Sequence, residues 1–347
     1  MALIKKIRVQ HVRAHTEYET AISPTVTVIT GPNGAGKTSL IEALFVSLTG
    51  SSFKGSDNDI IQDKSAWYRI DVAFDDETVR TVKYDPSRQT GRKQFIIDHK
   101  TNYRMPASGK YPVVLFEPDD LRLLGGSPSR RRQFIDRFIG QIDPRYSIAV
   151  RRYERALKQR NSLLKQTQLS QESLFAWNVS LSEYGAYIIT QRQAFIAMIN
   201  QDIESVYRTI AGSKDAVTVR YSHHPHANIQ QKLLSDLHDH FEKDTIMGFT
   251  SVGPHRHDVL FDFNGSAALT VASRGEVRSM ILALKFLEVN ITETQTDKKP
   301  LILLDDVFSE LDETRQKNLM TEFTDHQIII TSVSALPIKG GTVIRLP

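Results

Sequence analysis

The chain has 347 residues, with 44 lysines and arginines against 40 aspartates and glutamates, which gives a net charge of +4. This length predicts about two domains, or one domain with a large insertion, and the slight basic excess permits nucleic-acid binding without requiring it. The absence of cysteine excludes disulfides and thiolate metal sites and is compatible with a reducing cytoplasm. No apolar run approaches the roughly 18 residues of a membrane span, and the first residues lack a signal-peptide pattern. We therefore expect a cytoplasmic protein with no membrane partner.

The first part of the chain alternates between strand patterns and short turns. Alternating apolar residues predict strands between residues 3 and 30, and similar patterns predict strands over 68–74, 78–84, 94–97 and 113–116. Turn-forming residues such as Asp75-Asp76 and Asp85-Pro86 separate the middle segments, which predicts antiparallel pairing.

A glycine-rich loop follows the β-branched strand predicted over 26–30 and fits the pattern G-x-x-x-x-G-K-[ST] at every fixed position. Its glycines let several backbone N–H groups point at one phosphate, and the helix that starts behind it adds a partial positive charge. We expect Lys37 to reach the β- and γ-phosphates and to act in catalysis, and Thr38 to hold Mg²⁺. A chance match in a glycine-rich turn is the alternative, and the flanking strand and helix argue against it. The residues expected to bind the nucleotide here are Gly31, Pro32, Asn33, Gly34, Ala35, Gly36, Lys37, Thr38 and Ser39.

Composition changes after residue 125. From Leu174 to Tyr207 apolar residues recur mostly at three- and four-residue steps, which predicts an α-helical insertion with a hairpin of helices. The insertion also carries dense positive charge, including Arg160. Such charge is typical of a solvated helix face, but a run this one-sided favours a surface that faces nucleic acid. The residues expected to contact DNA are Arg130, Arg131, Arg132, Arg151, Arg152 and Arg155.

Residues 213–245 are polar and rich in histidine, with an irregular spacing that does not favour a metal site. Strand patterns return at 250–252 and 259–263. Residues 301–304 are four apolar residues, typical of a buried parallel strand, and two acids follow them. We expect Asp305 to hold Mg²⁺ opposite Thr38, and Asp306 to orient or deprotonate the water that attacks the γ-phosphate.

Two further segments are informative about the class of phosphate-loop protein. Ser273 and Gly275 form a Ser-x-Gly turn at a helix start, and residues 309–312 follow the paired acids with the sequence S-E-L-D. They resemble the signature loop and the D-loop of the ABC ATPases. This resemblance implies that Ser273 and Gly275 of one subunit cover the γ-phosphate bound by another, so that ATP joins a dimer.

Within the ABC and SMC-like group, the chain resembles the bacterial RecF family over most of its length. The matching segments are L-F-E-P-D-D-L-R-L at 115–123, G-S-P-S-R-R-R-Q-F-I-D at 126–136, V-G-P-H-R at 252–256 and L-L-D-D-V-F-S-E-L-D at 303–312. Arg13 stands where the family has N-F-R-N-Y, which implies a nucleotide contact. Two positions depart from the wider pattern: Glu276 replaces the usual glutamine, and the switch histidine of ABC transporters is absent near Val333, where Thr331 or Ser332 is expected to substitute in part.

The resemblance implies an α/β fold: an ABC-type P-loop NTPase head, with a mixed sheet and flanking helices, and an inserted α-helical second lobe. The expected parts are 1–125 and 246–347 for the head and 126–245 for the lobe. It further implies ATP and Mg²⁺ as cofactors, an ATP-dependent homodimer on double-stranded or gapped DNA, slow DNA-dependent ATP hydrolysis, and help in RecA loading with RecR-like and RecO-like proteins.

Three alternatives remain beside this hypothesis. One is a nucleotide-dependent head that acts on a protein partner without binding DNA. An SMC-like head is disfavoured because the insertion is too short for a long coiled-coil arm. A small-molecule kinase is disfavoured by the segments that resemble the signature loop and the D-loop.

Overall fold

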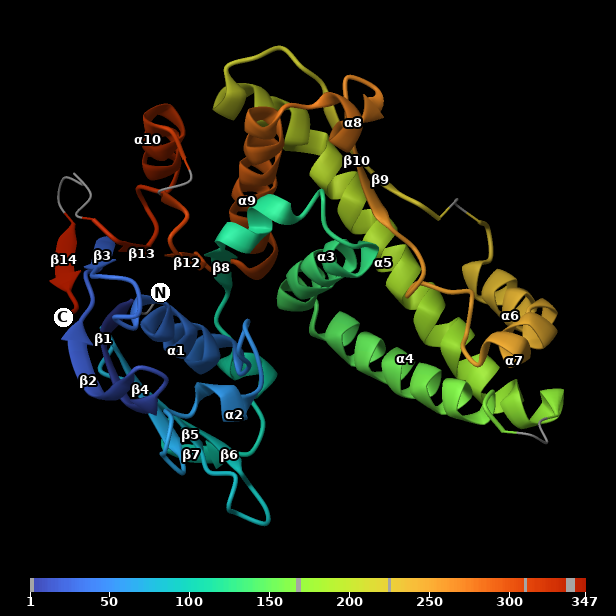
Figure 1. The fold of residues 1–347 in the computed structure, drawn as a ribbon, viewed down its shortest axis with the longest axis horizontal. Coiled ribbons are helices and arrows are strands. Elements are labelled where there is room, and N and C mark those ends of the chain that lie inside the picture. The colour runs from blue at the N-terminus through green and yellow to red at the C-terminus, as the bar shows by residue number, and fades with distance from the viewer. Residues whose placement is uncertain (1–2, 167–169, 224–225, 309–310, 335–340) are drawn as a thin grey trace. The chain divides into compact units, whose positions relative to one another are not determined.

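A computed structural model of the chain describes residues 3–166, 170–223, 226–308, 311–334 and 341–347 (Figure 1). The chain divides into two compact units. The first comprises Met1–Asp120 and Val289–Pro347, and the second comprises Leu121–Glu288. The second unit is therefore an insertion in the sequence of the first, and each unit is described separately below.

A parallel sheet forms the centre of the first unit, with the strand order β14-β3-β13-β12-β8. Its strands β3, β8, β12 and β13 are almost wholly buried, as continuous apolar runs in parallel sheets are. In parallel strands the carboxyl ends lie at the same edge, so the residues after β3, β12 and β13 meet there. The bounds are β3 Val26–Thr30, β8 Val113–Phe116, β12 Leu301–Leu304, β13 Ile328–Ser332 and β14 Thr342–Arg345.

An antiparallel sheet completes the first unit, with the strand order β2-β1-β4-β5-β6-β7. Helix α1 packs against its strands β1, β4 and β5, and apolar residues of both elements share one buried core (Figure 1). The strands are β1 Ile4–Val12, β2 His15–Ala21, β4 Tyr68–Phe74, β5 Val79–Tyr84, β6 Lys93–Ile97 and β7 Lys100–Asn102. The helices of this unit are α1 Lys37–Thr49, α2 Asp57–Ile60, the 3-10 helix η1 Ala107–Gly109 and α10 Glu313–Glu322.

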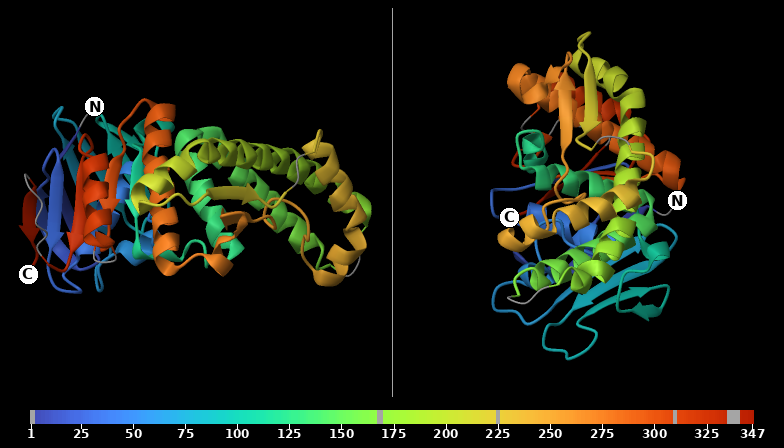
Figure 2. Two further views of the ribbon diagram at one scale, coloured as in Figure 1. Left: turned by 90° about the horizontal axis from the view of Figure 1, so that it is seen from above. Right: turned by 90° about the vertical axis from the view of Figure 1, so that its right-hand side faces the viewer.

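The second unit is mainly helical. Helix α5 is its longest element, and α4 and α6 both pack along it (Figure 2). A small antiparallel sheet with the order β11-β10-β9 lies beside α5. The helices are α3 Pro128–Ile142, α4 Pro144–Leu163, α5 Gln171–Ala211, α6 Ile229–Asp239, α7 Phe241–Met247 and α8 Ala268–Val271. The strands are β9 Val217–Tyr221, β10 Val259–Phe263 and β11 Ser266–Ala267. The 3-10 helix η2 Pro118–Arg122 and helix α9 Arg274–Thr296 span the unit boundaries.

The α/β class and the strands predicted over 68–74, 78–84, 94–97, 113–116 and 259–263 are confirmed, with small shifts at their ends. The strand predicted over 250–252 is wrong. Thr250 and Ser251 lie in an irregular segment, because their backbone N–H groups donate to side chains, Asn161 and Asp244 respectively, and not to a strand. The second unit also extends to residue 288, beyond the expected 245, because β10 pairs with β9 inside it.

Candidate nucleotide-binding site and basic helix face

The glycine-rich loop joins the end of β3 to the start of α1, as expected from the sequence. Gly34 and Gly36 both have φ near 89°, a left-handed conformation that side chains rarely adopt. A Cβ atom on Gly36 would lie 2.4 Å from Nε2 of His15, whose N–H donates to the Gly36 carbonyl at 3.0 Å. The loop therefore requires glycine at this position for reasons of both conformation and space.

Lys37 lies across the loop that precedes it. Its Nζ donates to the carbonyl oxygens of Gly31 at 2.9 Å and of Pro32 at 3.1 Å, and the residue is only 4% exposed. The hydrogen bonds that hold this buried ammonium come from neutral carbonyls, so its charge is suited to receive an anionic ligand. This cradle fits the phosphates of a nucleotide.

The paired acids lie at the carboxyl edge of the parallel sheet, next to the helix that follows the loop. The hydroxyls of Thr38 and Thr331 both donate to Oδ1 of Asp305, at 2.8 and 2.9 Å. Thr331 in turn accepts a hydrogen bond from the backbone N–H of Asp306 at 2.9 Å. The hydroxyl of Thr38 and the carboxylate of Asp305 are hard oxygen donors, which fit Mg²⁺.

Asp306 is half-buried and has a backbone φ of 51°. Burial raises the pKa of its carboxyl above the usual value; the neighbouring Asp305 adds to this effect, and the positive charge of Lys37 opposes it. A raised pKa makes a carboxylate a better proton acceptor near neutral pH. The chemistry of the site is therefore compatible with the role predicted for Asp306.

Sequence analysis missed three residues beside this site. Nζ of Lys54 lies 3.7 Å from Oδ2 of Asp305. Glu42 is fully buried on α1 and forms an ion pair with Arg13, whose Nη2 donates at 2.9 Å. Ser52 donates to the same carboxylate and accepts the backbone N–H of Lys54 at 2.9 Å. Arg13 is thus paired with a side chain of α1, and the segment that carries Lys54 is anchored to α1 through Ser52 and Glu42. These contacts join residues from different elements, so local sequence patterns could not predict the positions of Glu42, Ser52 and Lys54.

Ser273 and Glu276 form a reciprocal cap at the start of α9. The carboxylate of Glu276 accepts the backbone N–H of Ser273 at 2.6 Å, and the Ser273 hydroxyl accepts the N–H of Glu276 at 3.3 Å. The acid that departs from the expected glutamine therefore bonds within its own helix terminus. Gly275 lies in the first turn of α9. In the D-loop segment, residues 309–310 lie outside the described residues, and Asp312 caps α10 by accepting the N–H of Arg315.

Helix α4 presents a basic face to solvent. Its buried side follows Tyr146, Ala149, Tyr153 and Ala156 at helical spacing, which leaves the other side exposed. That exposed side contains Arg151, Arg155 and Lys158, and Arg152 beside them donates to the hydroxyl of Tyr184 at 2.9 Å. Arg151, Arg152 and Arg155 are therefore exposed, and their contact with DNA stays a prediction.

The arginine run at the start of α3 is placed differently. Arg131 is 8% exposed and forms a two-pronged ion pair with Asp258, with Nη2 at 2.7 Å, and it also donates to the carbonyls of Leu124 and Gly126. Arg132 is half-buried and donates to the carbonyl of His257 at 2.7 Å. Arg130 is half-buried as well. The structure thus corrects the expectation for Arg131, because a buried and paired guanidinium presents no surface to DNA.

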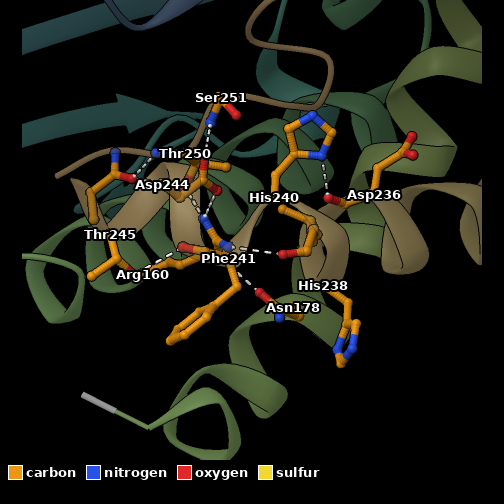
Figure 3. Close-up of polar contacts among 12 residues, drawn as sticks. Arg160, Asn178, Asp236, His238, His240, Phe241, Asp244, Thr245, Thr250 and Ser251 are labelled. Atoms are coloured by element: carbon orange, nitrogen blue, oxygen red, sulfur yellow. Dashed lines mark hydrogen bonds and ion pairs between the residues drawn. The ribbon is translucent and has the colours of Figure 1, made fainter. Parts of the chain in front are cut away.

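Arg160, which the sequence pattern groups with the basic run, is also in the interior. It is completely buried and donates to Asn178 at 2.8 Å, to Asp244 at 2.6 Å and to Thr250 at 2.8 Å, as Figure 3 shows. It also donates to the carbonyl of Leu237. Arg160 joins α4, α5 and α7 and is a structural residue of the second unit.

The segment 252–257 supplies two half-buried histidines. Tyr153 contacts Nδ1 of His255 at 2.7 Å, and burial lowers the pKa of His255 to about 4. Burial likewise lowers the pKa of His257 to about 3. Among the described residues, no group of three or more His, Asp or Glu side chains is arranged to hold a metal ion. In the same part of the chain, no helix combines the length and apolar character needed to cross a bilayer.

Comparisons with known proteins agree with this geometry. The profile of the RecF/RecN/SMC N terminal domain family matches residues 3–341. The DNA replication and repair protein RecF of Streptococcus agalactiae serotype V is 34% identical, and the match covers 98% of this chain and 97% of that protein. The RecF of Lachnoclostridium phytofermentans is 32% identical over 95% of this chain and 92% of that protein.

Solved structures show the same likeness. The recombination mediator protein RecF of the RecFOR pathway, in a structure described as RecF-ATPrS, superimposes with a TM-score of 0.91 at 27% identity, covering 100% of this chain and 96% of that one. An Smc head bound to the C-terminal winged-helix domain of ScpA has a TM-score of 0.53 at 14% identity, covering 96% of this chain and 90% of that one, and shows the common fold alone.

Proposed function

Because the chain belongs to the RecF family, we propose that it is an ATPase of recombinational repair that uses ATP and Mg²⁺ and acts on double-stranded or gapped DNA in the cytoplasm. The convergence of Thr38 and Thr331 on one oxygen of Asp305, beside the cradled Lys37, is the observation that carries the ATPase part. It brings together oxygen donors for a cation and an ammonium for phosphate, from segments that are far apart in the sequence.

Each residue of this site has a defined part in hydrolysis. Mg²⁺, held by Thr38 and Asp305, would neutralise charge on the phosphate oxygens. Lys37 exchanges its loop carbonyls for the β- and γ-phosphates. Asp306 orients a water and accepts its proton as the water oxygen bonds to the γ-phosphorus and the bond to the β–γ bridging oxygen breaks, which yields ADP and phosphate.

We further propose that the site is completed by a second copy of the chain. Ser273 and Gly275 at the start of α9 would then cover the γ-phosphate of the partner, since a helix N-terminus favours an anion. The carboxylate of Glu276 already accepts the backbone N–H of Ser273, which directs it to its own helix terminus. ATP-dependent dimerisation, with slow hydrolysis as the reset, follows from this composite site.

DNA binding is assigned to the exposed face of α4. Arg151 and Arg155 are one turn apart, and Lys158 continues the same exposed side. A row of cations of this kind fits the phosphate backbone of DNA, and contacts to phosphates carry no information about base sequence. By membership of the RecF family, the protein would help RecA loading at gapped DNA together with RecR-like and RecO-like proteins.

ATP hydrolysis measured against protein concentration, with and without duplex and gapped DNA, tests this function. We expect the rate of ATP hydrolysis per subunit to rise with protein concentration and with added DNA. For the Asp306→Asn variant we expect a hydrolysis rate close to zero. A rate that is independent of both concentration and DNA would contradict the dimer on DNA. It would instead support the alternative, a head that acts on a protein partner without direct DNA binding.

The DNA face has its own test. Replacing Arg151, Arg152 and Arg155 with alanine should weaken duplex binding for all sequences, and the slope of log affinity against log salt should fall by about 0.9 for each DNA phosphate that is no longer neutralised. The matched control is Arg208→Ala, which removes an exposed arginine of α5 that pairs with Glu204. Equal affinity and slope in both variants would remove α4 from the DNA interface.

A further inference from the structure

A pocket of about 440 Å³ lies at one end of the antiparallel sheet of the first unit. It opens where β4 and β6 end and where β5 and β7 begin, and residues of the segment 106–111 complete its wall. None of its lining residues belongs to the candidate nucleotide site or to the exposed face of α4. The proposed function therefore leaves this pocket without a use.

The charged residue of its inner wall is Arg80 of β5. Arg80 pairs with Val72 on β4 and stands two residues before Val82, and both valines belong to the buried core. Because side chains alternate along a strand, the Arg80 side chain lies on the core face of the sheet. Its guanidinium lies over the ring of Phe74, 5.5 Å from the ring centroid. Arginine is rarely placed toward a core unless an acid pairs with it.

Arg80 has no ion-pair partner among the described residues. Its Nη1 donates to the carbonyl of Ser47 at 3.1 Å, and its Nε is buried with no hydrogen-bond partner in the part of the chain that the structure describes. Burial lowers the pKa of the guanidinium from its usual value, and the charge of Asp98 opposes this effect. A cation that loses hydration without gaining a paired carboxylate lowers the stability of the folded chain.

The contact with Ser47 explains only part of this arrangement. Ser47 lies in the last turn of α1, where a cation stabilises the helix end. That contact uses Nη1 alone. Nε and Nη2 form the other side of the guanidinium, which is the side that binds a carboxylate through two parallel hydrogen bonds. The Arg80 side chain thus keeps a buried donor that an anion could satisfy.

Apolar side chains line the same pocket. Val79 is 53% exposed, and Ile97 and Pro106 are half-buried. An exposed valine at the start of a strand leaves apolar surface in water that a ligand could cover. A ligand that fills this pocket therefore meets a desolvated cation and apolar surface together.

The remaining charges of the pocket do not favour a cation as the ligand. Lys100 and Asp98 both line it, are both exposed and carry opposite charges. The carboxylate of Asp76 accepts the backbone N–H of Thr78 at 3.1 Å and the Thr78 hydroxyl at 2.6 Å, so it is engaged within its own turn. Of these charges, only that of Arg80 lies on the core face with a buried donor left unsatisfied.

From these observations we infer that the pocket is a binding site for a carboxylate attached to an apolar group. The carboxylate lies on Nε and Nη2 of Arg80, and the apolar group packs against Val79 and Ile97. A free aliphatic acid and the C-terminal residue of a peptide both have this chemistry. The ligand supplies the paired charge that the folded chain lacks at Arg80. The site goes beyond the proposed function, because it needs neither ATP nor DNA.

Thermal unfolding of the full chain tests the inference, since a ligand that binds only the folded state raises the melting temperature. The Trp177→Phe background leaves Trp67, a residue of the first unit, as the reporter. At constant ionic strength, N-acetyl-leucine should raise the melting temperature saturably. N-acetylleucinamide, which lacks the charge, should not, and acetate, which lacks the large apolar group, should act more weakly. No rise with N-acetyl-leucine, or an equal rise with the amide or with acetate, overturns the site.

Two longer probes distinguish the two sources of the carboxylate. Octanoate represents a free aliphatic acid, and N-acetyl-leucyl-leucine represents the end of a peptide. The probe that acts at the lower concentration identifies the source. If both act more weakly than acetate, the apolar part of the site is refuted.

Arg80→Met separates a ligand site from a purely structural role. This variant removes the charge and keeps an apolar side chain, so without ligand it should melt at or above the wild-type temperature, and it should lose the response to N-acetyl-leucine. Melting several degrees below the wild type would show that Arg80 is kept to hold the end of α1. A retained response would show that the acid binds elsewhere, and either result overturns the site. The matched control is Arg92→Met, which alters an exposed arginine of the same unit outside this pocket and should keep the wild-type response.

Discussion

The buried ion pair between Arg160 and Asp244 gives a sharp prediction about the stability of the second unit. Both side chains are 0% exposed, and the guanidinium also donates to Asn178, Thr250 and the carbonyl of Leu237. Replacing Asp244 with alanine leaves a guanidinium in the interior with neutral partners only. Removal of one member of a buried pair costs about 3–5 kcal/mol in the free energy of unfolding, because the remaining charge stays desolvated and uncompensated.

Urea unfolding followed by tryptophan fluorescence measures this cost. Trp177 lies in α5 next to Asn178, so Trp67→Phe leaves a reporter within the second unit. The control is Lys232→Ala, which breaks an exposed pair with Asp236 on α6 and should cost about 0–1 kcal/mol.

Two outcomes test whether the cost comes from an uncompensated buried charge. A loss below about 1 kcal/mol for Asp244→Ala, equal to the control, would refute the reasoning that the charge is fully desolvated. The double variant Arg160→Met with Asp244→Leu removes both charges and should recover most of the loss, because an apolar pair of similar size carries no desolvation cost. Failure to recover would show that the hydrogen bonds to Asn178 and Thr250 dominate.

Three further predictions concern the pH response and the two helix starts. Burial lowers the pKa of His255 to about 4. Between that value and about 6.5 the unfolded chain binds a proton that the folded chain does not, so stability is complete above pH 6.5 and falls toward pH 4. His255 alone should lower the urea midpoint between pH 7 and pH 5 by an amount equivalent to about 2 kcal/mol. Because the pKa of His257 is also lowered, to about 3, His255→Gln should remove this part of the pH dependence and leave the part that His257 contributes. Gly36→Ala should abolish binding of a fluorescent ATP analogue and lower the melting temperature, because its Cβ would lie 2.4 Å from His15 in a left-handed backbone; normal binding would contradict the loop geometry. Glu276→Gln should leave the melting temperature nearly unchanged because glutamine keeps the cap to Ser273, whereas Glu276→Ala should cost about 1 kcal/mol; equal losses would argue against the cap.

The candidate nucleotide site was predictable from sequence because its parts are local. Lys37 and Thr38 belong to one short motif, and Asp305 and Asp306 directly follow an apolar run that can only be a buried strand. Their meeting needs only the rule that parallel strands share a carboxyl edge. The role of Thr331 was partly foreseen for the same reason, since it lies near the end of a neighbouring strand.

The errors have a common physical origin in long-range partners. Arg131 and Arg155 have the same side chain and similar basic neighbours, yet Arg131 is buried because Asp258 lies beside it, 127 residues away in the sequence. Arg160 is buried because Asp244, 84 residues away, accepts its charge. Local composition contains no information about such pairs.

The separation between the two halves of the nucleotide site has a consequence for biosynthesis. Thr38 and Asp305 are 267 residues apart in the sequence, whereas the second unit is one continuous stretch between them. At about 5–20 residues per second, a ribosome needs roughly 13–53 s to reach the carboxylate after it has made the hydroxyl. Throughout that interval the glycine-rich loop lacks the strands β12 and β13, whereas the inserted unit is complete at residue 288, before either strand has been made. The order of synthesis thus gives the nascent chain its helical unit first and its phosphate site last.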